Sequence, residues 1–249
     1  MHNENEASAQ QASQIAQLSV TTTESETLAN VAYRQLRVDI IRGERKPGER
    51  LRIEKLKSIY GIGPTPVREA LQKLTADQLV VTQGNRGFAV APLLLEEFED
   101  LNIARTSIEK EAIRLAIKRG DNTWEANIVA AHYLLKKEDQ TLSKLKTGIP
   151  DSWENANSAF HSAIVNACGS SWLLRTRASL ADLCERYRRT SIYQRQGERD
   201  LAAEHAAITE AVLDRDGSQA CLLIEKHFTI TVQAFVDSDP QSINSEVNA

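Results

Sequence analysis

Beyond Pro92 the apolar residues follow a helical period almost to the end of the chain, and no strand-like alternation interrupts them. Glycine and proline residues divide this stretch into six segments with short connections. The predicted helices lie at residues 95–119, 123–145, 151–168, 171–195, 198–215 and 217–236. Such helices bury their apolar faces by packing as an antiparallel bundle. The sequence therefore predicts an all-helical domain over 94–238 and a frayed tail at 239–249.

The first part of the chain follows a different pattern. Helical stretches at 29–41 and 51–60 come before Thr65 and Pro66, which are typical of a helix start because a hydroxyl caps free N–H groups and proline suits the first turn. Two β-prone runs, 79–82 and 88–91, then flank a glycine-containing turn suited to a hairpin. Three short helices and a hairpin predict a winged helix-turn-helix.

We place this winged helix-turn-helix at residues 28–93. Residues 1–27 contain no Lys, Arg or aromatic residue, so they cannot bury enough apolar surface to offset the entropy of ordering, and we expect a disordered N-terminal arm. The fold class is thus mostly α, with an N-terminal winged helix-turn-helix and a C-terminal antiparallel helical bundle.

Positive charge is concentrated in one segment of an acidic chain. The whole chain has a net charge of -4, whereas residues 28–93 hold 12 Lys and Arg against 6 Asp and Glu. A basic segment between acidic neighbours favours contact with a polyanion such as DNA. A solvated charged face would give the same imbalance, so charge alone does not decide between the two.

Other function classes lack their sequence signals. No run of about 18 apolar residues occurs, and the first residues have neither the basic nor the apolar part of a secretory signal, so we expect a cytoplasmic protein without a membrane partner. Cys168, Cys184 and Cys221 are far apart and odd in number, which favours buried free thiols. There is no HExxH motif, nucleophile elbow or phosphate-binding glycine loop, so we predict that the chain is not an enzyme.

Three histidines lie on the apolar stripes of predicted helices: His161, His205 and His227. A single histidine in such a place is most often a hydrogen-bonded core residue. Three of them on three helices of one bundle could instead face a common ion, since neutral imidazoles suit zinc, nickel and related metals. The pattern predicts a metal site in the bundle, with hydrogen-bonded core histidines or a metal-free pocket as the alternatives.

Arg105 lies on an apolar stripe of the first bundle helix, where a charge needs an anionic partner. The partner is either Glu109, one turn further on, or a carboxylate elsewhere in the bundle, or the carboxylate of a bound acid held by the guanidinium group. Tyr187, Arg189 and Tyr193 are candidates to line the same pocket from another helix. We interpret the neighbouring Arg186, Arg188 and Arg189 as a solvated face.

The N-terminal segments 47–51, 64–71 and 86–90 resemble the winged helix-turn-helix of GntR-type regulators. The helical half is similar to the effector domain of the fatty-acid-regulator subfamily, called the FCD domain, so the resemblance covers roughly 28–236. The stretch 61–71 and the region around Trp124 are most similar to glutarate-responsive repressors of that subfamily.

The resemblance implies a set of DNA contacts: Arg52, Thr65, Arg68, Arg86 and Gly87. A guanidinium at the start of a recognition helix pairs with guanine in the major groove, and an arginine in the wing enters the minor groove. The family has Ser-Arg where this chain has Gly63 and Pro64, so one contact is missing and the operator sequence is expected to differ.

Metal-binding FCD domains have an aspartate four residues before the first histidine, and here that residue is Asn157. The implied ligands of a divalent metal are Asn157, His161, His205 and His227, with zinc first and nickel or manganese as alternatives. The resemblance further implies a small carboxylic acid effector that binds at this metal and at Arg105, and we expect a dicarboxylate.

The predicted function is that of a homodimeric transcription repressor that binds palindromic double-stranded operator DNA under the control of this acid. An activator would carry the same residues. The rival from another class is a metal-dependent hydrolase or hydratase that uses the three histidines. A third possibility is an architectural DNA binder with a structural metal core, whose DNA affinity does not respond to metabolites.

Overall fold

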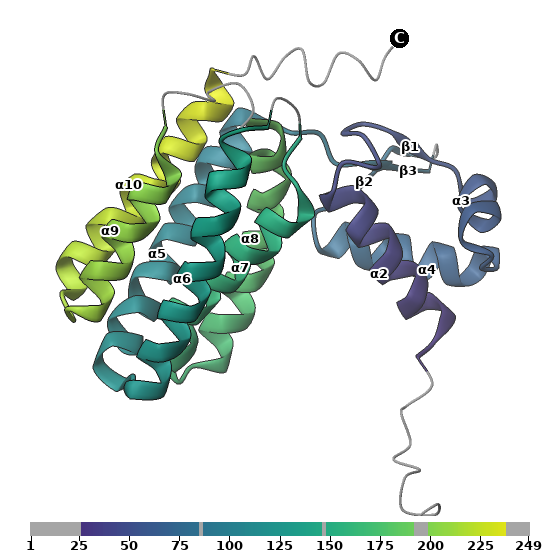
Figure 1. The fold of residues 1–249 in the computed structure, drawn as a ribbon. Coiled ribbons are helices and arrows are strands. Elements are labelled where there is room, and N and C mark those ends of the chain that lie inside the picture. The colour runs from purple at the N-terminus through teal and green to yellow at the C-terminus, as the bar shows by residue number, and fades with distance from the viewer. Residues whose placement is uncertain (1–25, 85–86, 146–147, 192–198, 238–249) are drawn as a thin grey trace, which may run out of the picture.

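The computed structural model describes residues 26–84, 87–145, 148–191 and 199–237, and Figure 1 shows them as two parts. The N-terminal part comprises α2 (Leu28–Ile41), β1 (Arg50–Leu51), α3 (Ile53–Tyr60), α4 (Pro64–Ala76), β2 (Val80–Thr82) and β3 (Phe88–Val90). The C-terminal part comprises α5 (Leu95–Arg119), α6 (Asn122–Leu142), α7 (Asp151–Val165), η2 (Asn166–Cys168), α8 (Ser171–Ser191), α9 (Leu201–Leu213) and α10 (Gly217–Val236). The predicted winged helix-turn-helix and helical bundle are both confirmed. The predicted arm and tail fall almost wholly outside the described residues.

The sheet of the N-terminal part has one strand more than the predicted hairpin. β3 lies between β1 and β2 and pairs antiparallel with both, and Ala89 stands opposite Arg50 on one side and Val81 on the other. Leu51 therefore belongs to a strand and not to the second helix, which begins at Ile53. This strand has no local signal because its two residues are held only by pairing with β3.

α4 also begins earlier than predicted. Its N-cap is Gly63, which makes no side-chain cap, and Pro64 occupies the first helical position. Proline suits that position because its missing N–H would have no helical partner there. The predicted capping role of Thr65 is therefore wrong, and this residue lies in the first turn with its side chain exposed.

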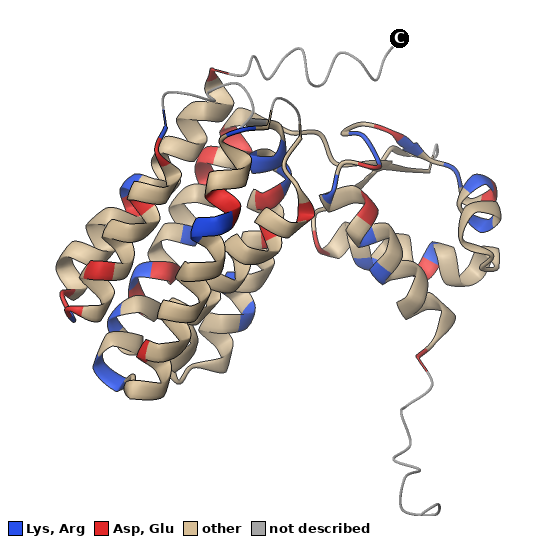
Figure 2. Ribbon diagram, in the orientation of Figure 1, with Lys and Arg blue, Asp and Glu red and all other residues tan. Residues whose placement is uncertain are grey.

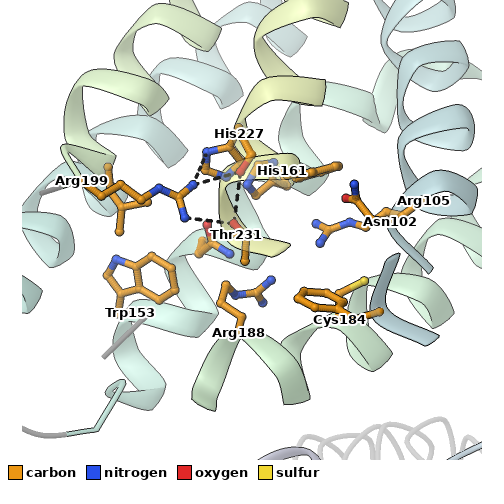
Figure 3. Close-up of a pocket in the computed structure, with 13 residues that line it drawn as sticks. Asn102, Arg105, Trp153, His161, Cys184, Arg188, Arg199, His227 and Thr231 are labelled. Atoms are coloured by element: carbon orange, nitrogen blue, oxygen red, sulfur yellow. Dashed lines mark hydrogen bonds between the residues drawn. The ribbon is translucent and has the colours of Figure 1, made fainter. Parts of the chain in front are cut away.

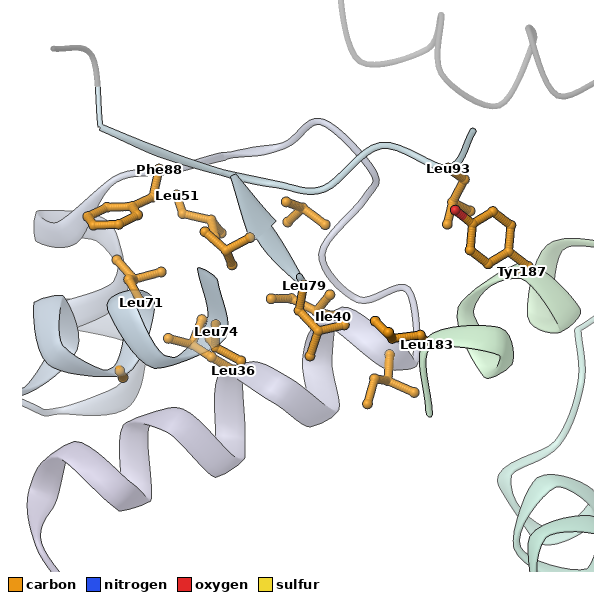
Figure 4. Close-up of a cluster of buried hydrophobic side chains, with 14 of the residues drawn as sticks. Leu36, Ile40, Leu51, Leu71, Leu74, Leu79, Phe88, Leu93, Leu183 and Tyr187 are labelled. Carbon is orange, nitrogen blue, oxygen red and sulfur yellow. The ribbon is translucent and has the colours of Figure 1, made fainter. Parts of the chain in front are cut away.

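One apolar cluster fills the N-terminal part and continues into the bundle. Figure 4 shows Leu36 and Ile40 of α2 against Leu71 and Leu74 of α4, all at most 2% exposed. The same cluster contains residues of the bundle helices α5, α8 and α10: Phe98, Leu101, Leu183, Cys184, Tyr187, Val232 and Phe235. The two parts therefore share buried apolar surface, which resists their separation.

Polar contacts accompany this shared core. Arg186 of α8 donates to the backbone oxygen of Ala91 at 2.5 Å, just before the first bundle helix. Arg42 at the end of α2 lies 3.1 Å from the Asp151 carboxylate at the start of α7. These contacts connect the N-terminal part to two helices, α7 and α8, that flank the cavity described below.

The bundle has a second apolar core, formed by α5, α6, α7, α9 and α10. Trp153 and Phe160 of α7 are its largest fully buried members on that helix, at 1% and 0% exposed. In the described part of the chain no helix is long and apolar enough to cross a membrane.

Candidate functional site

The exposed side of α4 is the first candidate surface. Val67, Ala70 and Leu71 are fully buried, so the helix turns Thr65 and Arg68 toward solvent. Among the described residues, Arg68 makes no ion pair, and Asp77, a possible partner, accepts instead from the Tyr33 hydroxyl at 2.6 Å. Arg68 is thus an exposed cation at the start of a helix.

Two more predicted contact residues surround this helix. Arg52 is the exposed N-cap residue of α3, and Gly87 precedes β3 with a φ of 104°, a left-handed conformation that favours glycine. Arg86 lies outside the described residues. Figure 2 shows further Lys and Arg on α2 and α3, in keeping with the positive charge of this part.

The second candidate site is a cluster of histidines inside the bundle. His161 on α7, His205 on α9 and His227 on α10 are 2%, 0% and 7% exposed, as their apolar stripes predict. One ligand atom from each lies within 4.8 Å of the others. The three residues are far apart in the sequence, so only the packing of the three helices brings them together.

Several polar atoms of this cluster have no partner within the described part of the chain: Nδ1 of His161, Nε2 of His205 and Oδ1 of Asn157. Asn157 is 3% exposed and lies one turn before His161 on α7. A buried polar atom without a hydrogen bond costs free energy, and protein sites with several of them commonly hold a missing ion or ligand. The donor set of imidazole nitrogens and an amide oxygen fits a divalent metal ion.

Two of the histidines contact a carboxylate through Nδ1. Nδ1 of His205 lies 2.9 Å from Oδ2 of Asp139 on α6, and Nδ1 of His227 lies 2.7 Å from Oε2 of Glu204 on α9. Asp139 also accepts from Trp153 Nε1 at 2.8 Å. Each contact occupies Nδ1 and leaves the other ring nitrogen, Nε2, for another ligand.

Burial favours the neutral form of His161 and His227. The pKa of His161 lies well below its usual value because the ring is buried and because His227 and Arg105 are nearby. Burial likewise lowers the pKa of His227 to about 3, although the hydrogen bond with Glu204 opposes the shift. Neutral imidazole is the form that binds a metal ion.

Arg105 on α5 is buried at 6% exposure, and its guanidinium stacks over the Phe228 ring at 3.9 Å. Glu109, one partner that the sequence offered for Arg105, pairs instead with Arg177 of α8: Nε of Arg177 donates to Oε2 of Glu109 at 2.8 Å. Within the described residues Arg105 makes no ion pair, and its Nε has no hydrogen-bond partner. Burial lowers the pKa of Arg105 accordingly.

One cavity joins two of the histidines, His161 and His227, to this arginine. Figure 3 shows Arg105, Arg188 and Arg199 around the same space as His161 and His227. Its walls are Phe98, Asn102, Arg105, Trp153, Asn157, His161, Cys184, Arg188, Arg199, Leu201, His227, Phe228 and Thr231. The cavity volume is about 20 Å³, which is room for about one water molecule or a metal ion.

Two of these arginines were not expected from the sequence. Arg188 is 8% exposed and forms a bidentate ion pair with Glu154, from Nε to Oε1 at 2.9 Å and from Nη2 to Oε2 at 2.7 Å. Arg186, in the same run, is 5% exposed. The interpretation of this arginine run as a solvated face is therefore wrong. Arg199 donates to both carboxylate oxygens of Glu204, from Nε at 2.8 Å and from Nη2 at 2.7 Å. Arg188 and Arg199, the two other arginines of the cavity wall, therefore already have anionic partners.

Tyr187, one of the two tyrosines predicted for the pocket, does not line it. Tyr187 lies behind Phe98, with ring centroids 4.3 Å apart, and its hydroxyl donates to Glu97 at 2.9 Å. It belongs to the core that joins the bundle to the N-terminal part. Tyr193 lies outside the described residues.

Comparison with known families decides the family. The bacterial regulatory protein gntR family matches residues 28–90, and the FCD domain matches residues 100–229, more than half of the chain. This chain belongs to the GntR family of transcription regulators, FCD subfamily.

Relatives agree with this assignment. The GntR regulator is 39% identical over 199 residues to the HTH-type transcriptional repressor GlaR of Escherichia coli, covering 78% of this chain and 90% of that one. It is 36% identical over 206 residues to the uncharacterised regulator BphR of Paraburkholderia xenovorans, covering 83% and 84%. These relatives are transcription regulators, in agreement with the prediction that the chain is not an enzyme.

Solved structures show the same fold. Escherichia coli McbR/YncC superposes with a TM-score of 0.69 at 18% identity and covers 85% of this chain and 98% of its own. A regulator from Rhodococcus sp. RHA1 superposes with a TM-score of 0.68 at 20% identity, covering 84% and 97%. At this identity the likeness concerns the fold alone.

Proposed function

We propose that this GntR regulator is a repressor whose affinity for operator DNA is set by a small dicarboxylic acid, bound together with a divalent metal ion in the bundle cavity. The observation that carries the proposal is Arg105, a buried cation without an anionic partner among the described residues, in the same cavity as His161 and His227 of the histidine cluster. A permanent unpaired charge in a core is costly, so its natural complement is an anionic ligand.

The residues that would hold the metal are His161, His205, His227 and Asn157. Zinc is the first choice, and nickel and manganese are the alternatives for nitrogen and oxygen ligands. When bound, the metal would supply a positive charge and open coordination positions for a carboxylate. Because Asn157 is neutral, more of that charge is left for an incoming acid than an aspartate would leave.

A dicarboxylate matches the remaining charge of the cavity. Glu154 and Glu204 already neutralise Arg188 and Arg199, so within the described walls the uncompensated cations are Arg105 and the metal. One carboxylate would bind the metal and the other the guanidinium, which pairs with carboxylates through two parallel hydrogen bonds. Glutarate is the first acid to test because the sequence resembles glutarate-responsive members of the subfamily.

The small volume of the cavity indicates how binding of the acid would affect the DNA-binding part. A volume of about 20 Å³ does not admit a dicarboxylic acid, so binding has to displace wall residues. Phe98 is one such residue, and it stacks on Tyr187 and edge-on against Phe235 in the core shared with the N-terminal part. Displacement of Phe98 would therefore change how the DNA-binding part sits on the bundle.

At the operator, Arg68 would contact bases in the major groove, and Arg52, Thr65, Gly87 and Arg86 would fix the module on the phosphates and in the minor groove. We propose that the protein acts as a homodimer on a palindromic site, because two-fold symmetric proteins read two-fold symmetric DNA. The likeness to a relative named as a repressor supports repression over activation.

The test is a thermal-shift screen of C3 to C6 carboxylic acids on protein of known metal content. A ligand specific to the folded state raises the melting temperature by mass action. The proposal expects a dicarboxylate to raise it in metal-loaded protein, and expects the rise to vanish in metal-stripped protein and in His205→Ala. The proposal fails if no acid shifts the melting temperature, or if the shift is the same without metal.

A further inference from the structure

Two buried carboxylates stand outside the histidine cluster, each on the far side of one imidazole ring. Asp139 of α6 faces Nδ1 of His205, and its side chain is only 2% exposed. Glu204 of α9 faces Nδ1 of His227, and its side chain is 20% exposed. Neither carboxylate lines the cavity.

We propose that Asp139 and Glu204 are positioning residues for the metal: they fix which nitrogen of His205 and His227 faces the ion, and they hold each ring in that orientation. This inference rests on the metal site of the proposed function. It adds a role for two residues that lie behind the ligands and do not touch the ion.

The hydrogen bonds of Asp139 fix the proton on His205. Trp153 Nε1 can only donate, and it occupies Oδ1 of Asp139 at 2.8 Å. Oδ2 faces Nδ1 of His205 at 2.9 Å, and an ionised carboxylate can only accept. A histidine that binds a metal ion is neutral, so as a ligand His205 would carry its proton on Nδ1 and its lone pair on Nε2, the buried atom without a partner among the described residues.

The hydrogen bonds of Glu204 do the same for His227. Arg199 Nη2 has two N–H groups, and both have short acceptors, Oε2 of Glu204 at 2.7 Å and the backbone oxygen of His227 at 3.0 Å. Its 3.3 Å approach to Nδ1 of His227 is therefore not a hydrogen bond donated to the ring. Nδ1 donates to Glu204 instead, at 2.7 Å, and Nε2 is left for the ion.

Charge gives the second reason for this assignment. Three neutral imidazoles and the amide of Asn157 contribute no negative charge to balance a divalent ion. A carboxylate hydrogen-bonded to a metal-bound histidine makes that ligand more basic and holds its orientation. Asp139 is the more deeply buried of the two carboxylates, so its effect on affinity is expected to be the larger.

The test compares D139N and E204Q with two controls that remove the same charge nearby, E138Q on α6 and E210Q on α9. Glu138 is only partly buried and accepts from the Ser152 hydroxyl at 2.8 Å, and Glu210 is exposed. The amide that D139N introduces has one acceptor oxygen for two donors, so it either faces Trp153 with an N–H or moves the proton of His205 to Nε2. Zinc affinity is measured by competition with a chromophoric chelator.

We expect zinc affinity to fall by about 10- to 100-fold in D139N and by a smaller factor in E204Q, with E138Q and E210Q unchanged. Melting temperatures in excess chelator show whether each variant folds, and the metal-induced rise in melting temperature repeats the affinity ranking. If wild-type protein binds zinc and D139N binds it as tightly as E138Q, the positioning role is refuted. If wild-type protein binds no metal, the metal part of the proposed function fails first.

Discussion

Replacing Arg105 with methionine should make the ligand-free protein more stable, which is the opposite of what removal of a buried side chain usually does. The substitution removes a charge that is 6% exposed and keeps a similar volume. Arg177 is the matched control, because it is 5% exposed and on the neighbouring helix α8, but it is paired with Glu109 at 2.8 Å.

The size of the effect follows from the contacts of each arginine. Burial of an unpaired ion costs several kcal/mol after relaxation, and the stack of Arg105 on Phe228 returns about 2 kcal/mol at most. We therefore expect Arg105→Met to stabilise the protein by about 1–3 kcal/mol. Arg177→Met leaves Glu109 buried and unpaired, so it should destabilise by about 3–5 kcal/mol.

The assay is thermal unfolding followed by circular dichroism at pH 7, in excess chelator and without any carboxylic acid. For a chain of this size, 1 kcal/mol corresponds to about 2–4 °C. Arg105→Met should raise the melting temperature, and Arg177→Met should lower it by about 6 °C or more. If Arg105→Met lowers the melting temperature as Arg177→Met does, Arg105 has an anionic partner in the folded protein and the reasoning for an acid pocket is refuted.

Three further outcomes are expected. In excess chelator the melting temperature should fall as the pH drops below about 6.5. Histidines of the unfolded chain take up protons in that range, whereas His161 and His227 stay neutral in the folded protein because burial lowers their pKa values, that of His227 to about 3. A melting temperature that does not change from pH 7 to 5 would contradict their burial. Arg68→Ala should weaken binding to a selected operator by about 1–3 kcal/mol and reduce the preference for that sequence over random duplex, as measured by competition. If the variant and the wild type show the same preference, Arg68 does not contact the bases. Tyr187→Phe should lower the unfolding free energy by about 0.5–1.5 kcal/mol in denaturant titrations, since it removes the hydrogen bond to Glu97, and no loss would show that this bond is not formed in solution.

Local signals in the sequence were sufficient for most of the helices. Glycine and proline mark helix ends through backbone conformation alone, which is why α5 and α10 begin and end where the apolar period predicted. The inward direction of the three histidines likewise follows from helical spacing. Leu51 was assigned to a helix because its strand depends on pairing with Phe88, far along the chain.

The charged residues of the cavity could not be predicted in the same way. Arg188 pairs with Glu154, 34 positions away, and Arg177 pairs with Glu109, 68 positions away. Partners on other helices therefore allow these arginines to be buried, although the run that contains Arg188 is typical of an exposed face. Asp139 did carry a local signal that was missed. It lies on the apolar stripe of α6 with Leu135 and Leu142, both buried, where a carboxylate needs a partner.

The most direct test of the account is the affinity for operator DNA with and without the acid. The operator is selected from random duplexes by the metal-loaded protein, and binding is followed by fluorescence anisotropy at fixed salt. The account predicts that a saturating dicarboxylate weakens wild-type binding by about 5- to 150-fold and leaves Arg105→Met, which binds DNA normally, unaffected. Equal affinity with and without every acid tested, or a response of Arg105→Met equal to that of wild type, would contradict it.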